Sequence, residues 1–457
     1  MSTKKTYKKV LNRYNCFRLN YYRFFSLKKN RKTIFLFGIF NIFILSNICS
    51  EPLKEYISSS IKTVQFHRNE WPLSYPIIRL NSEQQLLLSF DELGSSTKNF
   101  QYTIVLCDAD WNVSDLMVTE YISGSPINPI IDYSYSFNTT IDYIHYRLKL
   151  PNEDIRPLRS GNYMLMVFKD YDQNNPVLKK KFMISEPMVN IVPRIRNTAS
   201  SSIRASHHEI NFEVHHPGFT IRNPMDEISA TIIQNGRKDN RIQGLRPQFV
   251  RNDLLDFNYN RETMMEGGNE FRYLDIRSYR FYSDKIEEIV FLDPFYHVRL
   301  FADLPRNPSS YQYRQDLNGR YYIEVQERNN ADLEADYMFI HFRLRVNQPQ
   351  LSQRVYLNGA LTNWELNESS QMHYNPTNNA YELSLLLKQG YYNYHYLVIE
   401  EGEKTGTLFP MENSFQQTEN DYLILIYYKG LTDRVHRLIG AETFNSTLPQ
   451  PRSRPGH

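Results

Sequence analysis

The sequence predicts an all-β fold made of several consecutive immunoglobulin-like β-sandwich domains that follow a cleaved signal peptide. Aromatic residues make up 14% of the chain, with 34 Tyr and 27 Phe, and such residues suit a half-buried pleated surface. Apolar and polar residues alternate in many segments, and no long segment repeats apolar residues at helical spacing. Alternation at every second position is the pattern of strands with one buried face.

Three segments show this alternation most clearly. Apolar side chains occupy every second position in residues 144–150, 338–344 and 392–396. We expect each segment to form a strand with one face on a core and the other in water. Turn signals such as Gln234-Asn235-Gly236 and Lys388-Gln389-Gly390 separate the strands. Short strands at this spacing are typical of β-sandwiches.

The chain divides into a signal peptide, three β domains and a tail. We predict a signal peptide over 1–50, an N-terminal β-sandwich over 61–187, a middle β domain over 188–310, a C-terminal β-sandwich over 311–430 and a disordered tail over 431–457. A mature chain of this length ordinarily forms several domains, each with its own core. The tail is assigned as disordered because it has no core-forming pattern.

Residues 1–50 have the pattern of a secretory signal. Residues 1–32 contain eleven Lys and Arg and no acidic residue, and an apolar run follows over residues 34–45. A membrane-spanning helix needs about 18 or more apolar residues, so cleavage near Ser50 is favoured over an uncleaved anchor. The residues before Cys49 lack the small residue of a lipoprotein signal, which favours plain cleavage over lipidation. We therefore expect an exported chain without direct membrane insertion.

Removal of the signal reverses the charge balance. The whole chain has 53 basic and 50 acidic residues, and residues 1–50 hold eleven of the basic ones and none of the acidic ones. A nucleic-acid partner requires a basic face, so the acidic mature chain argues against nucleic acid. Only Cys107 of the three cysteines lies after the signal. It has no disulfide partner, and we expect a buried free thiol.

The segment Cys107-Asp108-Ala109-Asp110-Trp111 is the strongest candidate for chemistry. A carboxylate pair could bind Ca²⁺ or act in acid–base catalysis. No further carboxylates complete a calcium loop, so we favour a strand end at which Asp108 and Asp110 cap a turn beneath a packed Trp111. A periplasmic hydrolase that uses Asp108 and Asp110 is the least favoured functional class.

Other catalytic and metal-binding patterns are missing from the sequence. The pairs His207-His208 and His215-His216 could each offer one ligand, but no third ligand completes a metal site, so we interpret them as surface and rim histidines. No nucleophile elbow, zinc-protease motif or phosphate loop occurs. We therefore predict no catalytic residue, no metal, no cofactor and no small-molecule substrate, and we do not expect an enzyme.

Two segments in the middle of the chain predict structural roles. Gly267-Gly268-Asn269 lies between strands without a following helix, so it predicts a tight turn whose polar side chains bind the backbone. Asp275 and Arg277 predict an ion pair on one strand face. Such a pair more often orders a domain junction than performs catalysis.

The C-terminal domain leaves two interpretations open. Residues 355–364, followed by strands over 380–387 and 391–399, resemble the early-set immunoglobulin domains of glycogen- and starch-binding modules. Those modules bind sugars by stacking on exposed aromatic side chains. Trp364 is interpreted first as the core tryptophan of the sandwich. The alternative is a sugar-stacking Trp364 in a periplasmic carbohydrate-binding protein.

A series of motifs in order resembles the type IX secretion system plug protein family, over nearly the whole mature chain. The first-domain motifs lie in residues 61–67, 71–80, 107–111, 136–140, 150–154 and 160–163, and the likeness continues in residues 234–237 and 267–278. Gly236-Arg237-Lys238 departs from the family, in which Trp tends to follow Arg. The matching residues that we single out as interface or structural positions are Trp71, Asp108, Asp110, Trp111, Asn235, Gly236, Gly267, Gly268, Asn269, Asp275 and Arg277.

The resemblance implies a function that the residues alone do not give. The family acts in the periplasm of Bacteroidota, where it associates with the outer membrane through a protein partner. The implied partner is a very large translocon barrel that exports proteins bearing a C-terminal signal domain. The implied role is to close the periplasmic mouth of that barrel by protein–protein docking. The family has no catalytic residues to transfer to this chain.

Overall fold

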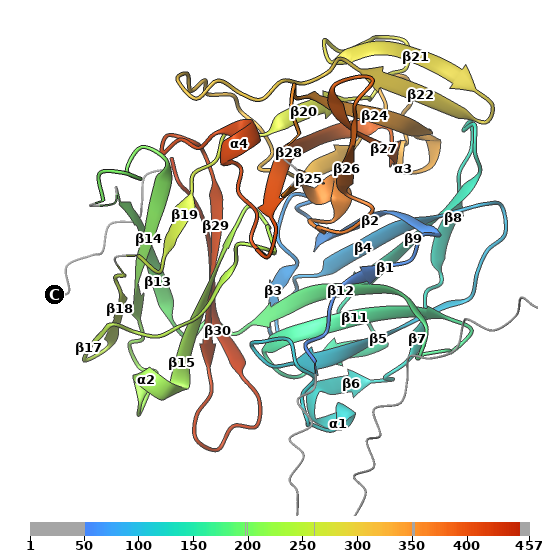
Figure 1. Cartoon of the computed structure of the whole chain (residues 1–457). Helices are drawn as coiled ribbons and strands as arrows, with labels where there is room; N and C mark the ends of the chain where they lie inside the picture. The colour runs from blue at the N-terminus through green and yellow to red at the C-terminus, as the bar shows by residue number, and fades with distance from the viewer. Residues whose placement is uncertain (1–50, 197, 199, 260, 350–351, 448–457) are drawn as a thin grey trace, which may run out of the picture. The chain divides into compact units, whose positions relative to one another are not determined.

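The computed structural model describes residues 51–447, apart from 197, 199, 260, 350 and 351, and these residues form an all-β fold (Figure 1). The predicted signal peptide and the last residues of the predicted tail lie outside the described residues. Helices within the described part are single short turns: α1 (Val118–Tyr121), α2 (Pro224–Glu227), α3 (Ala331–Glu334), α4 (Phe409–Glu412) and the 3-10 turn η1 (Ala360–Thr362).

The first domain packs two sheets around one core. The larger sheet has the order β1 (Tyr56–Ile57), β12 (Pro176–Ser185), β11 (Gly161–Lys169), β5 (Phe100–Cys107), β7 (Asn128–Pro129), with β3 (Ile77–Arg79) also on β12. The second sheet has the order β2 (Ile61–Arg68), β4 (Leu86–Leu93), β9 (Tyr143–Leu150), β8 (Asp132–Tyr135), and β10 (Ile155–Pro157) pairs with β6 (Ile122–Gly124). Leu88 and Phe90 of β4 pack with Ile104 and Leu106 of β5 in a shared core, as in a sandwich.

The middle domain also consists of two sheets around a core. One sheet has the order β13 (Asn190–Arg196), β14 (His207–His215), β18 (Leu254–Phe257), β17 (Phe249–Arg251), with β19 (Met264–Glu266) also on β14. The other has the order β16 (Ile242–Leu245), β15 (Ile228–Gln234), β29 (Asp421–Tyr428), β30 (Arg437–Asn445). Phe212 of β14 stacks on Phe257 of β18, and both belong to a core with Ile232 and Ile424.

The third domain is built on one sheet of nine strands. Its order is β20 (Arg272–Asp275), β28 (Gly390–Glu400), β25 (Gln353–Asn358), β26 (Gln371–Asn375), β27 (Ala380–Lys388), β24 (Tyr337–Arg345), β22 (Phe295–Leu300), β21 (Ile286–Leu292), with β23 (Tyr321–Ile323) also on β28. Ile340 and Phe342 of β24 share a core with Leu357 of β25 and Tyr394 of β28. The strand β21 therefore lies at an edge of this sheet.

Strand pairing shows that the third domain is inserted into the middle domain. β20, β21 and β22 precede residue 310 yet pair with strands of the third domain. β29 precedes residue 430 yet pairs with β15 of the middle domain. The predicted boundaries at 310/311 and 430/431 are therefore wrong as limits between sheets. The chain leaves the middle domain after β19 and returns to it at β29.

Part of the predicted disordered tail is a strand. Residues 437–445 form β30, which pairs with β29 along its length. Leu438 and Ile439 are fully buried and join two different cores. A Cβ atom added at Gly440 would lie 2.7 Å from Cγ2 of Val189, so the strand packs closely on this side chain. The prediction of disorder was wrong for this segment. Its short apolar run becomes part of a core only when it packs against other strands, which the local sequence does not show.

A fourth apolar cluster joins the first and middle domains. Met164 and Met183 on the outer face of the first domain's larger sheet pack with Leu423, Leu425 and Leu438 of the middle domain. The backbone N–H of Glu186 also donates to the carbonyl oxygen of Leu438 at 2.8 Å. β29 is consequently buried on both faces, which explains its nearly uninterrupted apolar sequence.

The three alternating segments form strands, but their polar faces are not all in water. Residues 144–150, 338–344 and 392–396 lie in β9, β24 and β28 as predicted. In β28, however, Asn393 and His395 are fully buried. Asn393 accepts the backbone N–H of Leu317, and the His395 ring stacks on Phe271 with centroids 3.7 Å apart. The expectation of one wet face was wrong for β28, because loops cover that face.

Candidate functional site

The Cys107–Trp111 segment is a structural corner. Asp108 Oδ1 accepts the backbone N–H groups of Asp110 and Asn112, each at 2.9 Å. Trp111 adopts the left-handed conformation, with φ 69°, and is buried. Asp108 thus caps the turn beneath a packed tryptophan, as the sequence predicts, whereas Asp110 is exposed and takes part in the cap through its backbone N–H. Cys107 is a buried free thiol, as expected, and burial raises its pKa to about 12.

The Asn235–Gly236 turn links the middle domain to the third. Asn235 donates from Nδ2 to Asn420 Oδ1 at 2.6 Å and accepts the backbone N–H of Asp421 at 2.8 Å. Both turn residues have positive φ. A Cβ at Gly236 would lie 3.2 Å from Nε1 of Trp364. The turn thus needs a small residue both for its backbone and for the indole that packs on it.

Trp364 is a half-buried residue whose ring is packed on several sides. A Cβ at Gly319 would lie 2.3 Å from Cη2 of Trp364, and Phe271 meets the indole edge to face with centroids 6.2 Å apart. Because these groups occupy part of the ring surface, the packing favours the structural interpretation over sugar stacking. Trp71, by contrast, is 54% exposed, and the Arg68 guanidinium lies 4.6 Å from its ring centroid.

Gly267-Gly268-Asn269 lies where the two connections between the middle and third domains cross. A Cβ at Gly267 would lie 2.2 Å from the carbonyl oxygen of Phe415, so only glycine fits. Phe415 N–H donates to the carbonyl oxygen of Gly268 at 2.8 Å, and Asn269 Nδ2 donates to that of Glu412 at 2.8 Å. The prediction of a tight turn was wrong, because residues 267–271 form an irregular connection between β19 and β20 without a turn. The segment instead acts as a clamp between the outgoing and returning chain.

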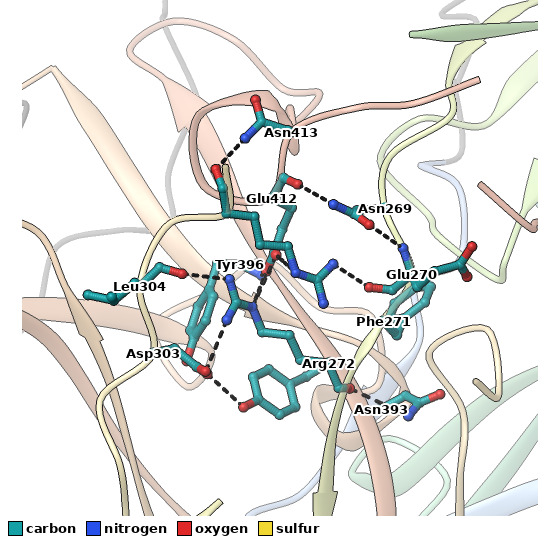
Figure 2. Close-up of polar contacts among 12 residues, drawn as sticks. Asn269, Glu270, Phe271, Arg272, Asp303, Leu304, Asn393, Tyr396, Glu412 and Asn413 are labelled. Atoms are coloured by element: carbon teal, nitrogen blue, oxygen red, sulfur yellow. Dashed lines mark hydrogen bonds and ion pairs between the residues drawn. The ribbon is translucent and has the colours of Figure 1, made fainter. Parts of the chain in front are cut away.

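A buried ion network continues from this clamp into the third domain (Figure 2). Arg272 pairs with Glu412 and with Asp303, each with a shortest N–O distance of 2.9 Å. Tyr394 and Tyr396 donate their hydroxyl groups to Asp303 at 2.8 and 2.9 Å. All five side chains are buried. The network therefore joins β20, where the chain enters the third domain, to helix α4, where it leaves, and to β28 within the sheet.

The acidic side chains of this network are paired with basic ones and are not arranged for proton transfer. Burial acts to raise the pKa of Glu412, but Arg272 and Arg306 outweigh it and hold that pKa below its usual value. Burial likewise opposes ionisation of Asp303, and Arg272 and Lys285 outweigh it and lower its pKa. Both carboxylates are therefore ionised partners of buried cations, which is a structural arrangement.

A second buried network connects the first and third domains. Asp91 of β4 and Lys388 of β27 are both about 1% exposed, and their charged atoms lie 2.6 Å apart. Tyr337 donates its hydroxyl to Asp91 at 2.7 Å, and His145 Nδ1 lies 2.6 Å from the other carboxylate oxygen. The Lys388 ammonium also sits 4.1 Å from the centroid of Tyr143. Burial favours the neutral acid, but Lys388 and His145 outweigh it and lower the pKa of Asp91.

The remaining candidates have structural surroundings. Arg277 and Asp275 form the predicted ion pair, 2.7 Å apart, and Arg277 also contacts Glu324 at 2.8 Å. Of the histidine pairs, His208 and His216 are buried rather than on the rim, and the ring nitrogens of His208 bond Tyr422 and Gln416 at 2.7 Å each. The described residues contain no group of three or more His, Cys, Asp or Glu that could hold a metal ion.

Comparison with known proteins identifies the family. A family model described as the type 9 secretion system plug protein 1st domain matches residues 61–186. The crystal structure of a hypothetical protein from Parabacteroides merdae is 36% identical, with a TM-score of 0.84 over 86% of this chain and 99% of that one. The chain belongs to the type 9 secretion system plug protein family. Among curated proteins, no match was found.

Family membership confirms the resemblance read from the sequence motifs. The family is that of a secretion-system component, which places this plug-family chain at the cell envelope. In the part of the chain that the structure describes, no helix is long and apolar enough to cross a membrane. The likeness to the Parabacteroides protein extends beyond the first domain, since it covers 86% of this chain. The inserted third domain is therefore part of the shared architecture.

The residues that join the domains of this plug-family protein lie far apart in the sequence, and no local motif marks them. Arg272 and Glu412 are 140 positions apart, and Asp91 and Lys388 are 297 positions apart. The local signal was weak, because Glu92 directly follows Asp91 in β4 and Lys388 ends β27 at a predicted turn. Only their burial in the folded protein shows that each needs a charged partner. The identity of that partner depends on tertiary packing.

Proposed function

We propose that this protein is the periplasmic plug of the type 9 translocon and closes the periplasmic mouth of its outer-membrane barrel by docking. The single observation that carries the proposal is the family match over residues 61–186. A plug must resist deformation when the channel is shut. The apolar cluster between the first and middle domains and the Asp91–Lys388 and Arg272–Glu412 networks suit such a role, because buried, paired groups fix one arrangement of the domains.

The edge of the nine-stranded sheet is the surface that we assign to docking. On edge strand β21, Phe291 and Leu292 are 48% and 56% exposed, and Phe281 in the preceding loop is 74% exposed. Tyr282, also exposed, donates to the carbonyl oxygen of Ile289 on this strand, so the loop lies against it. An edge strand with apolar side chains can pair with another chain, and aromatic residues are enriched at interfaces. The strands of a barrel wall or its periplasmic rim are a suitable partner.

Co-purification from the native envelope tests this proposal. Affinity-tagged protein is captured from the detergent-solubilised envelope, and co-purifying outer-membrane proteins are identified by mass spectrometry. We expect a large barrel with the wild-type protein and at least a ten-fold lower yield with the double variant Phe291→Asp/Leu292→Asp. Leu431→Asp is the matched control, because Leu431 is 95% exposed and lies in the loop between β29 and β30.

Two outcomes would contradict the proposal. Absence of any barrel with the wild-type protein would refute the plug function itself. Equal barrel recovery with wild type and the double variant would refute the assignment of the surface. Retention of the isolated protein on immobilised glucans, lost in Trp364→Ala, would instead favour the carbohydrate-binding alternative.

A further inference from the structure

A cavity of about 240 Å³ is lined by residues of all three domains. Trp111 comes from the first domain, Ile233 from the middle domain and Trp364 from the third. The charged residues of the lining are mostly basic: Lys180, Lys181, Arg237, Lys238, Arg241 and Arg320, with Glu55 as the acidic member. The cavity wall therefore carries excess positive charge, although the mature chain is acidic.

Four of these cations have carboxylate partners. Lys180 and Lys238 share Glu55, and Lys238 also contacts Glu365 at 2.5 Å. Arg237 pairs with Asp239 at 2.7 Å and Arg320 with Asp421 at 2.9 Å. Their charges are neutralised by the protein itself.

Lys181 and Arg241 differ from the other cations. Over the described residues, no carboxylate oxygen lies within 4.0 Å of either side chain. The Nε of Arg241 is buried and has no hydrogen-bond partner. The Lys181 ammonium lies 4.3 Å from the centroid of the Trp111 ring. Asp110 and Glu55 act on Arg241 only at longer range.

Two such cations in one cavity are costly without a counter-ion. Burial, and then the positive charge of Arg241, lower the pKa of Lys181 to about 8. Burial also lowers the pKa of Arg241. Lys181 and Arg241 are half-buried. Charges withdrawn from water are ordinarily paired or hydrogen-bonded, so these two side chains offer donors to the cavity for which the protein supplies no acceptor. A bound anion would supply the missing acceptor and neutralise both groups.

We propose that this cavity is an anion-binding site in which Lys181 and Arg241 hold a carboxylate or phosphate group. A guanidinium can donate two parallel N–H bonds to two oxygens of a carboxylate or a phosphate, and an ammonium adds a point charge. Trp111 forms an apolar wall beside the ammonium. The volume suits a single phosphate or one acidic side chain rather than a larger metabolite. The anion comes either from solution or from an acidic side chain of a protein partner.

The test uses the purified mature protein and two probes. Inorganic phosphate and an acetylated glutamate tetrapeptide are titrated separately, with sodium chloride at matched ionic strength as the reference. Binding is followed by tryptophan fluorescence and by the thermal unfolding midpoint. At a hundred-fold excess of anion over its Kd, the folding equilibrium is expected to shift about 100-fold. A response to phosphate assigns the site to a free anion, and a response to the peptide alone assigns it to a partner's acidic chain.

Variants separate a binding site from a structural pair of cations. Lys181→Met and Arg241→Met should each weaken anion binding at least ten-fold, whereas Lys149→Met, at an exposed position on β9, should leave it unchanged. Without anion, Lys181→Met should be at least as stable as wild type, because a half-buried charge that has no carboxylate partner is removed. A structural Lys181 would give a less stable variant.

Three results would overturn the proposal. The first is the absence of any response to both probes beyond that to sodium chloride. The second is an equal response in wild type, Lys181→Met and Arg241→Met. The third is a Lys181→Met variant that unfolds more easily than wild type in the absence of anion. No barrel takes part in this assay, so its failure is independent of the failure of the plug proposal.

Discussion

Replacement of Lys388 by methionine should destabilise the protein strongly. The Lys388 ammonium and the Asp91 carboxylate are 2.6 Å apart and almost inaccessible to water. At that distance and an effective dielectric constant of about 20, two unit charges attract by about 6 kcal/mol. Desolvation of both ions offsets most of this attraction in the folded protein. In the variant, however, Asp91 stays buried and loses its cation.

The expected loss lies at the lower end of the range for a broken buried pair. Removal of one partner ordinarily costs about 3–5 kcal/mol. Tyr337 still donates to Asp91, and His145 remains 2.6 Å from it. We therefore expect a decrease in the free energy of unfolding of about 3 kcal/mol.

Urea denaturation, followed by tryptophan fluorescence and circular dichroism, measures this loss. Lys149→Met is the control and should change stability by less than about 0.5 kcal/mol, since Lys149 is exposed. The double variant Asp91→Asn/Lys388→Met should recover most of the loss, because it leaves no unpaired charge. A loss below about 1 kcal/mol for Lys388→Met, or a double variant no more stable than the single one, would refute the argument.

Three further predictions follow from the described geometry. Cys107 should react slowly with a thiol reagent in the native protein and rapidly once denatured, because burial raises its pKa to about 12; fast native labelling would contradict its position. Gly267→Ala should cost about 1–3 kcal/mol in urea denaturation, because its Cβ would lie 2.2 Å from the Phe415 carbonyl oxygen; unchanged stability would contradict the clamp. The pKa values of Asp91 and Glu412 are lowered in the folded state. Their ionisation therefore contributes fully to the free energy of unfolding above the ordinary pKa values of 3.8 and 4.5, and this contribution is lost as the pH falls through the folded-state pKa values. The urea midpoint should therefore decrease on acidification below about pH 4.5, and a midpoint that rises there would contradict the sign.

Local sequence patterns predicted the strands well. Alternation placed β9 and β24 correctly, and turn residues identified the corner at Asp108 and the turn at Asn235. These features depend on neighbours within a few positions, which is the range over which side-chain periodicity and turn chemistry act. The ion pair between Asp275 and Arg277 was predictable for the same reason.

The pairing of distant segments was not predictable from these patterns. β29 has an almost continuous apolar sequence, which shows that both faces are buried but not which sheet it joins. β30 looks like a tail until β29 lies beside it. Asn393 and His395 were expected in water because alternation cannot show that loops cover them. The ion networks at the domain junctions were unpredictable for the same reason, because their partners meet only when the three domains pack together.

Outer-membrane permeability in the native host distinguishes a channel plug from a protein with another role. Uptake of a large antibiotic or dye is measured in wild type, in a strain lacking this protein, in a strain lacking the translocon barrel and in a strain lacking both. If the protein plugs the barrel, its loss alone makes the outer membrane leaky, and additional loss of the barrel restores the seal. Unchanged uptake in the single deletion, or leakage that persists without the barrel, would contradict it.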